Sequence, residues 1–99
     1  MSNNRPDYRP RPDVRFRVIA DEGVIVRQEA GEVLVVNEVG ARVLELLKDG
    51  VSTLDLVEKV AEEFDVAHDE LSRDLFPYLT ELETAGVIEE DARGHSGEV

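Results

Sequence analysis

EVLVVNE, residues Glu32–Glu38, contains the longest uninterrupted run of valine and leucine in the chain and ends at a helix start. Its centre, Val33 to Val36, is apolar and mostly β-branched, a composition that favours a strand. Because apolar residues occupy both alternating faces, we expect this strand to be covered on both sides. Asn37 then ends the strand, since its side-chain oxygen can accept from the first turn of a following helix.

Two strands are predicted before this stretch. Residues 14–18 alternate apolar side chains with arginines, the period of a half-buried strand, and residues 24–27 form a second apolar run. The turns at 21–23 and 29–31 are short, and loops of this length connect antiparallel neighbours. We therefore expect a three-stranded antiparallel sheet.

Three helices are predicted after the sheet. The first runs from Glu38 to Lys48 and closes at Gly50, and the second starts at Ser52. Its apolar positions are Leu54, Val57, Val60, Ala61 and Phe64. The third runs from about His68 to Ala85, and its core-facing positions are Leu71, Leu75, Tyr78, Leu79 and Leu82. Strands followed by helices on one side of the sheet define an α+β fold.

Pro77 falls inside the third predicted helix. A proline there removes one backbone hydrogen bond and clashes with the preceding turn. We expect a bend, or a division into two segments, near Arg73 to Pro77.

The ends of the chain differ in composition from its centre. Residues 1–13 hold three of the four prolines and are expected to form a flexible Pro/Arg-rich arm, either a solvated leader or a docking arm for an acidic surface. Residues 14–88 form the domain. Val87 and Ile88 are expected to pack back on it, and residues 89–99 form a mobile acidic tail.

The net charge of −12 restricts the partners. The first 17 residues carry five arginines and two aspartates, a net charge of +3, so residues 18–99 carry a net charge of −15. Nucleic-acid binding depends on neutralising phosphates with Lys and Arg, so neutral or basic peptides are better partners. No cysteine and no apolar run of membrane-spanning length occur, which indicates a cytoplasmic protein without a membrane partner.

Catalytic and metal-binding motifs are missing from the sequence. Its two histidines, His68 and His95, are not at zinc-ligand spacing, and no glycine-rich phosphate loop or nucleophile motif occurs. The paired carboxylates, such as Glu62 with Glu63, are typical of solvated helix faces. We expect no enzyme activity, no metal and no cofactor.

The predicted third strand offers a surface for binding if it lies at the sheet edge. An added peptide strand can satisfy its unpaired backbone groups, although an edge can also simply be guarded by charge or a covering helix. No Lys or Pro guards this stretch. Phe76 lies off the apolar line of the third helix, either exposed beside such a groove or packed near Pro77.

A longer pattern resembles a known family. It comprises an apolar strand ending in Asn37, a helix closing on Asp49-Gly50, Ser52-Thr53 opening the next helix, and Asp74-Leu75, Tyr78-Leu79, Leu82 and Gly86-Val87-Ile88 near the end. Over residues 14–88 this order and spacing resemble the PqqD-like family, also called RiPP recognition elements after ribosomally made and post-translationally modified peptides.

The resemblance implies a winged-helix-like domain that binds the leader segment of a precursor peptide. The leader adds as a strand to the third strand, lies against the third helix, and is delivered to a modifying enzyme such as a radical-SAM protein or a leader peptidase. The implied contributors are the backbone of Val33, Leu34, Val35 and Val36, a floor of Leu71, Leu75, Phe76 and Leu79, and the rim charges Arg73, Asp74 and Arg27.

One alternative comes from the same fold class. A winged-helix nucleic-acid-binding or transcription-regulatory module would place its third helix in the major groove. Residues 69–83 carry five carboxylates and a single arginine, which disfavours contact with phosphates.

Overall fold

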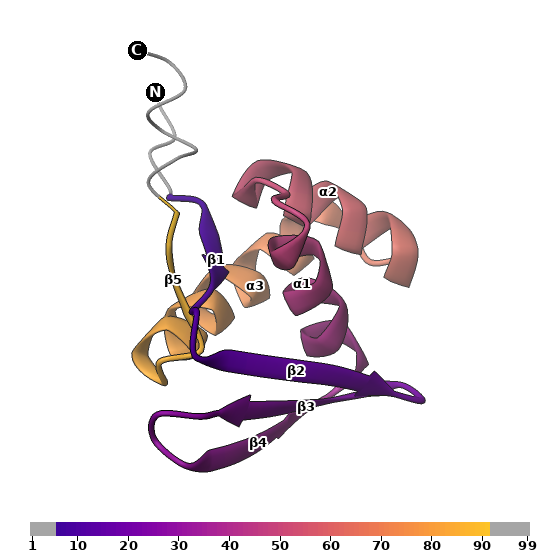
Figure 1. Ribbon diagram of the computed structural model, residues 1–99. Coiled ribbons are helices and arrows are strands. Elements are labelled where there is room, and N and C mark those ends of the chain that lie inside the picture. Colours follow the sequence, from indigo (N-terminus) through magenta and orange to yellow (C-terminus); the bar gives the residue numbers. More distant parts are fainter. Residues whose placement is uncertain (1–5, 92–99) are drawn as a thin grey trace.

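The computed structural model describes residues 6–91 and shows an α+β fold (Figure 1). Its elements are β1 (Tyr8–Pro10), β2 (Val14–Ile19), β3 (Glu22–Arg27), β4 (Glu32–Val36), α1 (Glu38–Lys48), α2 (Thr53–Phe64), α3 (His68–Thr84) and β5 (Ile88–Glu90). The three predicted strands and three predicted helices are confirmed. In addition, β1 and β5 form a separate two-stranded antiparallel sheet.

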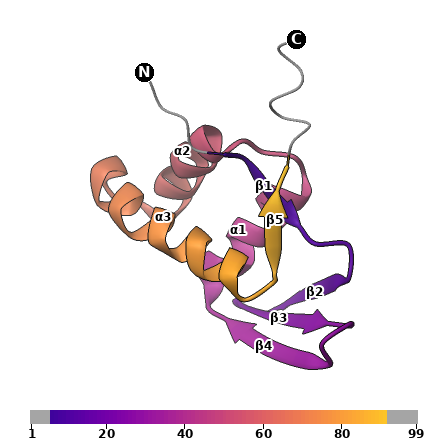
Figure 2. The same cartoon turned by 90° about the vertical axis from the view of Figure 1, so that its left-hand side faces the viewer.

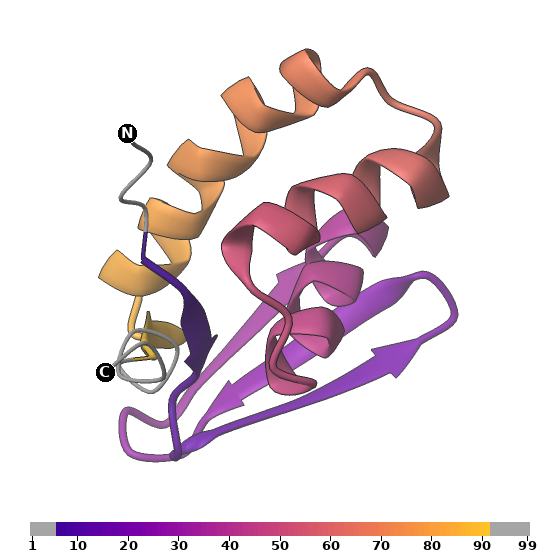
Figure 3. The same cartoon turned by 90° about the horizontal axis from the view of Figure 1, so that it is seen from above.

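The main sheet has the order β2-β3-β4, so both β2 and β4 are edge strands. Both pairings are antiparallel, with Phe16 opposite Ile25 and Ile25 opposite Leu34. All three helices lie on the same side of this sheet (Figures 1 and 3). Helix α1 packs on β3 and β4, and α3 lies toward the β4 side of the sheet.

The prediction that the third strand is covered on both faces is wrong. Val33 and Val35 of β4 are 63% and 64% exposed, whereas Leu34 and Val36 are half-buried toward the helices. The reason is the one-sided arrangement of the helices, which leaves the other face of the sheet open. The composition of β4 therefore does not reflect burial within this chain.

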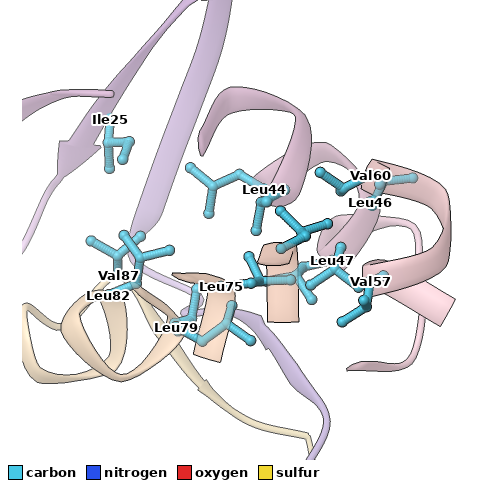
Figure 4. Packing of buried hydrophobic residues seen from close by; sticks show 14 of the residues in the cluster. Ile25, Leu44, Leu46, Leu47, Val57, Val60, Leu75, Leu79, Leu82 and Val87 are labelled. Atoms are coloured by element: carbon cyan, nitrogen blue, oxygen red, sulfur yellow. The ribbon is translucent and has the colours of Figure 1, made fainter. Parts of the chain in front are cut away.

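The core lies between the sheet and the helices. Its fully buried side chains include Ile25, Leu44, Leu47, Leu56, Leu79 and Ile88. Leu44 and Leu47 of α1 meet Leu75 and Leu79 of α3 in this cluster (Figure 4). Burial of each such side chain contributes about 1.5–3 kcal/mol, so this shared cluster supplies much of the driving force for folding.

One predicted core position of α2 is wrong. Leu54 is 62% exposed, and Leu56 is fully buried in its place. Two residues apart on a helix, these leucines lie on opposite faces. The buried stripe runs through Leu56, Val57 and Val60, so Leu54 points to solvent.

Helix ends follow the predicted capping residues. The Asn37 side chain accepts a hydrogen bond from the Gly40 N–H at 3.0 Å, and the Ser52 hydroxyl accepts one from the Asp55 N–H at 3.2 Å. Gly50 and Gly86 follow the ends of α1 and α3 with φ of 88° and 81°. These left-handed conformations favour glycine, which has no β-carbon to clash.

Helix α3 runs from His68 to Thr84 without interruption, so the predicted division into two segments is not found. Pro77 and Arg73 both lie on the exposed side of the helix. Water can therefore hydrogen-bond the Arg73 carbonyl, which has no N–H partner at Pro77.

The stretch expected to be a flexible arm contains an ordered strand. Tyr8–Pro10 pairs with Ile88–Glu90, and the Arg9 guanidinium lies 2.9 Å from a Glu89 carboxylate oxygen. Val87 and Ile88 are buried, which confirms that they pack back on the core. Glu89 and Glu90, expected to begin the mobile tail, belong to this strand pair instead. Residues 1–5 of the predicted arm and 92–99 of the predicted tail lie outside the described residues. Within residues 6–91, none of the helices is long and apolar enough to cross a membrane.

Candidate functional site: the β4 edge and helix α3

The free edge of β4 presents the backbone of Val33 and Val35. The Gln28 N–H donates to the Asp13 carbonyl at 3.1 Å, so Gln28 directs its backbone groups toward β2. By alternation along β3, the residues paired with Leu34 and Val36 direct theirs toward β4. Because these directions alternate along an antiparallel strand, Leu34 and Val36 bond toward β3. The backbone groups of Val33 and Val35 point away from the sheet, and no strand of the described chain pairs with them.

A hollow of about 220 Å³ lies beside the C-terminal end of β4, between α1 and α3. It is lined by Asn37, Val39, Gly40, Leu71, Asp74, Leu75 and Tyr78. Leucine side chains and a tyrosine ring form most of its wall, so it suits an apolar side chain with one polar contact. α3 lies on the β4 side of the sheet in Figure 2. The hollow is next to the end of β4 because Asn37, the residue after this strand, is part of its lining.

Tyr78 joins the two helices that form the hollow. Its hydroxyl oxygen lies against Gly40, in the place that a β-carbon would occupy. A β-carbon there would also lie 2.9 Å from the Val36 β-carbon, so close packing of α1 on both β4 and α3 depends on glycine.

The charge around the hollow is negative. Among the described residues that line it, Asp74 is the only charged one. Burial raises the pKa of Tyr78, and the nearby Glu81 carboxylate raises it further. Tyr78 therefore stays neutral at physiological pH and can both donate and accept a hydrogen bond.

The predicted site residues fall into separate groups in the structure. Leu71, Asp74 and Leu75 come together at the hollow, next to β4. Leu79 is 2% exposed and belongs to the core. Arg73 and Phe76 line a different hollow on the opposite side of α3, together with Asp69, Ser72, Pro77 and Thr80.

Arg27 lies at the other end of β4. Its guanidinium pairs with Glu32 and packs against Gly86, where a β-carbon would lie 2.6 Å from one of its nitrogens. Its Nε is buried and has no hydrogen-bond partner within residues 6–91. Arg27 thus connects the start of β4 to the end of α3, and its remaining exposed fraction is small.

Four residues of the hollow were not among the predicted site residues: Asn37, Val39, Gly40 and Tyr78. The first three belong to the start of α1, which the sequence marks only as a cap and a helix. A glycine inside an otherwise good helix was the one available signal, since such a residue often permits a close approach.

The sequence of the domain matches a known family over residues 22–88, the family described as "Coenzyme PQQ synthesis protein D (PqqD)". The chain belongs to the PqqD family. Among proteins of curated function, none matches it.

Two solved structures share the fold of this PqqD-family chain. One, described as "TbiB1 in Complex with the TbiA(beta) Leader Peptide", is 26% identical with a TM-score of 0.77, and the match covers 82% of this chain and 94% of that one. The other, "Lasso peptide synthetase B1 complexed with the leader peptide", is 24% identical with a TM-score of 0.73 and covers 84% and 98%. Both neighbours hold leader peptides.

Titratable side chains do not gather into a metal site in the described part of the domain. Within residues 6–91, no group of three or more His, Cys, Asp or Glu side chains is placed to hold a metal ion. What the site offers is a free strand edge beside an apolar hollow, an arrangement that suits binding of an extended peptide.

Proposed function

We propose that this protein binds the leader segment of a ribosomally made precursor peptide by strand addition at β4. The observation that carries the proposal is the exposed edge of Val33 and Val35, which is apolar, unpaired and adjacent to the hollow under α3. Membership of the PqqD family and the leader-bound neighbours support the same function.

The direction of the edge groups sets the register of the bound leader. Leader residues that exchange hydrogen bonds with Val33 and Val35 place their side chains on the open face of the sheet. The residues between them, opposite Leu34 and Val36, point toward α3. We assign the hollow lined by Leu71, Leu75 and Tyr78 to one of these inward side chains.

The remaining candidate residues take supporting roles in this proposal. Asp74 is a rim charge beside the inward side chain. Leu79 supports the floor from the core, and Arg27 holds the far end of β4 against α3. Arg73 and Phe76 face the other side of α3, so we assign them no contact with the leader.

We infer that the protein is a non-catalytic carrier that presents the leader to a modifying enzyme, of the radical-SAM type or a leader peptidase. The binding surface leaves the part of the precursor beyond the leader free. Because the precursor is made by ribosomes in the cytoplasm, we place this step there.

Proline substitutions at the two sheet edges test strand addition. Val35→Pro removes a backbone N–H that points outward from β4 and leaves the β3–β4 ladder intact, a position that tolerates proline. Val18→Pro removes an outward N–H from the opposite edge, β2, and serves as the matched control. The probe is a labelled synthetic leader of a precursor encoded beside this gene, titrated by fluorescence anisotropy.

We expect micromolar or tighter binding by the native protein, corresponding to about −8 kcal/mol or better. Val35→Pro should weaken it at least about tenfold, through the lost hydrogen bond and the steric block. Val18→Pro should bind as the native protein does. Equal weakening by both variants, or unchanged affinity in a folded Val35→Pro protein, would exclude β4 as the site.

A further inference from the structure

The opposite edge of the sheet, β2, is also unpaired in the described part of the chain. By the alternation that directs Val33 and Val35 outward, the backbone groups of Phe16 and Val18 point away from β3. No strand within residues 6–91 pairs with this side of β2. Val18 and Ile19 are 37% and 55% exposed, so the edge is not covered by other side chains.

Positive charge without a carboxylate partner gathers beside this edge. Within the described part of the chain, five cationic side chains form no ion pair with a carboxylate, namely Arg15, Arg17, Lys48, Lys59 and Arg73. The first two belong to β2. Lys48 ends α1 above the same strand, with its amine 5.8 Å from the centre of the Phe16 ring.

Two hollows accompany β2 on the side of the helices. Their volumes are about 420 and 370 Å³, and Phe16 and Lys48 line both of them. The first is completed by Arg9, Pro10, Val14 and Arg15, so none of its lining residues is acidic. The second is completed by Val18, Arg42, Glu45 and Asp49, and Arg42 pairs with Glu45, so the excess of positive charge lies at the first. The Arg15 guanidinium is held there by the carbonyls of Pro12 and Val14, at 3.0 and 3.3 Å, which leaves its charge uncompensated.

We propose that the β2 edge is a second docking site, which accepts an acidic, extended segment of a partner protein as an added strand. The charge distribution selects this partner. The chain as a whole has a net charge of −12, yet this edge carries cations that form no ion pair within residues 6–91. The hollow beside β4, in contrast, is lined by Asp74 and, among the described residues, by no cation. A second copy of the chain would bring Arg15 and Arg17 against themselves, which disfavours self-association.

The geometry also specifies the pattern of the docked segment. Residues that exchange hydrogen bonds with Phe16 and Val18 point toward the helices, onto the Phe16 ring and the two hollows. Their neighbours point to the open face, to which Arg15 and Arg17 belong by alternation, although the Arg15 side chain also lines the first hollow. The segment therefore alternates apolar residues with Asp or Glu.

Charged side chains also guard strand edges against pairing, and a synthetic peptide separates that role from docking. The probe is Ac-GVEVEVEG-NH2, and its matched control is Ac-GVKVKVKG-NH2. Each is titrated into the ¹⁵N-labelled full chain at low ionic strength. We expect the acidic peptide to shift the amide signals of Phe16 and Val18 with a Kd on the order of 0.1–1 mM, and the lysine peptide to bind at least about tenfold more weakly.

Variants show whether binding of the acidic peptide depends on the β2 edge and on the positive charges of Arg15 and Arg17. Val18→Pro and the double variant Arg15→Gln/Arg17→Gln should each weaken binding of the acidic peptide at least about fivefold. Val35→Pro should leave it unchanged, which keeps this site experimentally separate from leader binding at β4. Shifts confined to β4, equal binding of the two peptides, or no shifts with either peptide would overturn the proposal.

Discussion

The hydroxyl oxygen of Tyr78 on α3 occupies the space into which a β-carbon on Gly40 of α1 would project. Val36 of β4 approaches the same point, with its β-carbon 2.9 Å away. Three elements thus meet at one glycine, and their meeting point forms a wall of the hollow beside the β4 edge. The shape of the proposed leader site depends on this contact.

Replacing Gly40 tests that dependence. In an exposed helix, alanine is more favourable than glycine by about 0.5–1 kcal/mol. At position 40 we expect the added methyl group to displace Tyr78 and strain Val36, for a net loss of about 1–3 kcal/mol in the free energy of unfolding. Urea denaturation followed by circular dichroism measures this change, and leader affinity should fall with it.

A double variant supplies the control. Tyr78→Phe removes the hydroxyl that meets the new methyl group, so Gly40→Ala/Tyr78→Phe should recover part of the lost stability. Recovery cannot be complete, because the contact with Val36 remains. A stability of Gly40→Ala equal to or above that of the native protein would show that the helices separate there without cost.

From the raised pKa of Tyr78 we expect the free energy of unfolding to fall at alkaline pH. Burial first, and then the Glu81 carboxylate, raise the pKa of Tyr78 in the folded chain. Below the ordinary tyrosine pKa of about 10, both states are protonated and the group has no effect. As the pH rises above that value, the unfolded chain ionises first, so the free energy of unfolding falls until the folded-state pKa is passed.

Comparison with Tyr78→Phe isolates this effect from the titration of lysines. The difference in free energy of unfolding between the two proteins should be constant from pH 7 to 9 and change in favour of the phenylalanine variant as the pH increases further. The phenolate absorbance provides a direct reading, since the chain has two tyrosines and no tryptophan. In a Tyr8→Phe background, a midpoint at or below the ordinary value would contradict the raised pKa.

The elements of the fold were predictable because their signals are local. Asn37 and Ser52 cap helices through hydrogen bonds that span three residues, and the short turns fix antiparallel neighbours. Burial was harder to predict. Val33 and Val35 have the composition of a core strand, yet they are exposed. The helices cover one face of the sheet, and nothing within residues 6–91 covers the other.

The candidate site was predictable only on its α3 side. Leu71 and Leu75 share a face by helical period, but the opposite wall comes from the start of α1, and no local pattern reports that contact. Phe76 was ambiguous for a related reason. Its position off the apolar line was visible in the sequence, whereas the side of α3 that faces β4 depends on tertiary packing.

The residues that precede β1 are hydrogen-bonded to the start of α2, far away in the sequence. The Thr53 N–H, at the start of α2, donates to an Asp7 carboxylate oxygen at 2.9 Å, and the Thr53 hydroxyl donates to the Pro6 carbonyl at 2.6 Å. Thr53 is only 2% exposed, so water cannot readily replace these partners. Asp7→Ala should therefore lower the free energy of unfolding by about 1–2 kcal/mol, the usual cost of a lost helix cap or an unpaired buried donor.

Asp7→Asn is the matched control, because its amide oxygen can still accept the Thr53 N–H. It should retain most of the stability that Asp7→Ala loses, in urea denaturation at the same pH and ionic strength. Since β1 pairs with β5, the amides of Ile88–Glu90 should also exchange faster with solvent in Asp7→Ala. Native stability and unchanged exchange in Asp7→Ala would mean that the β1–β5 pair is held without the contact to α2.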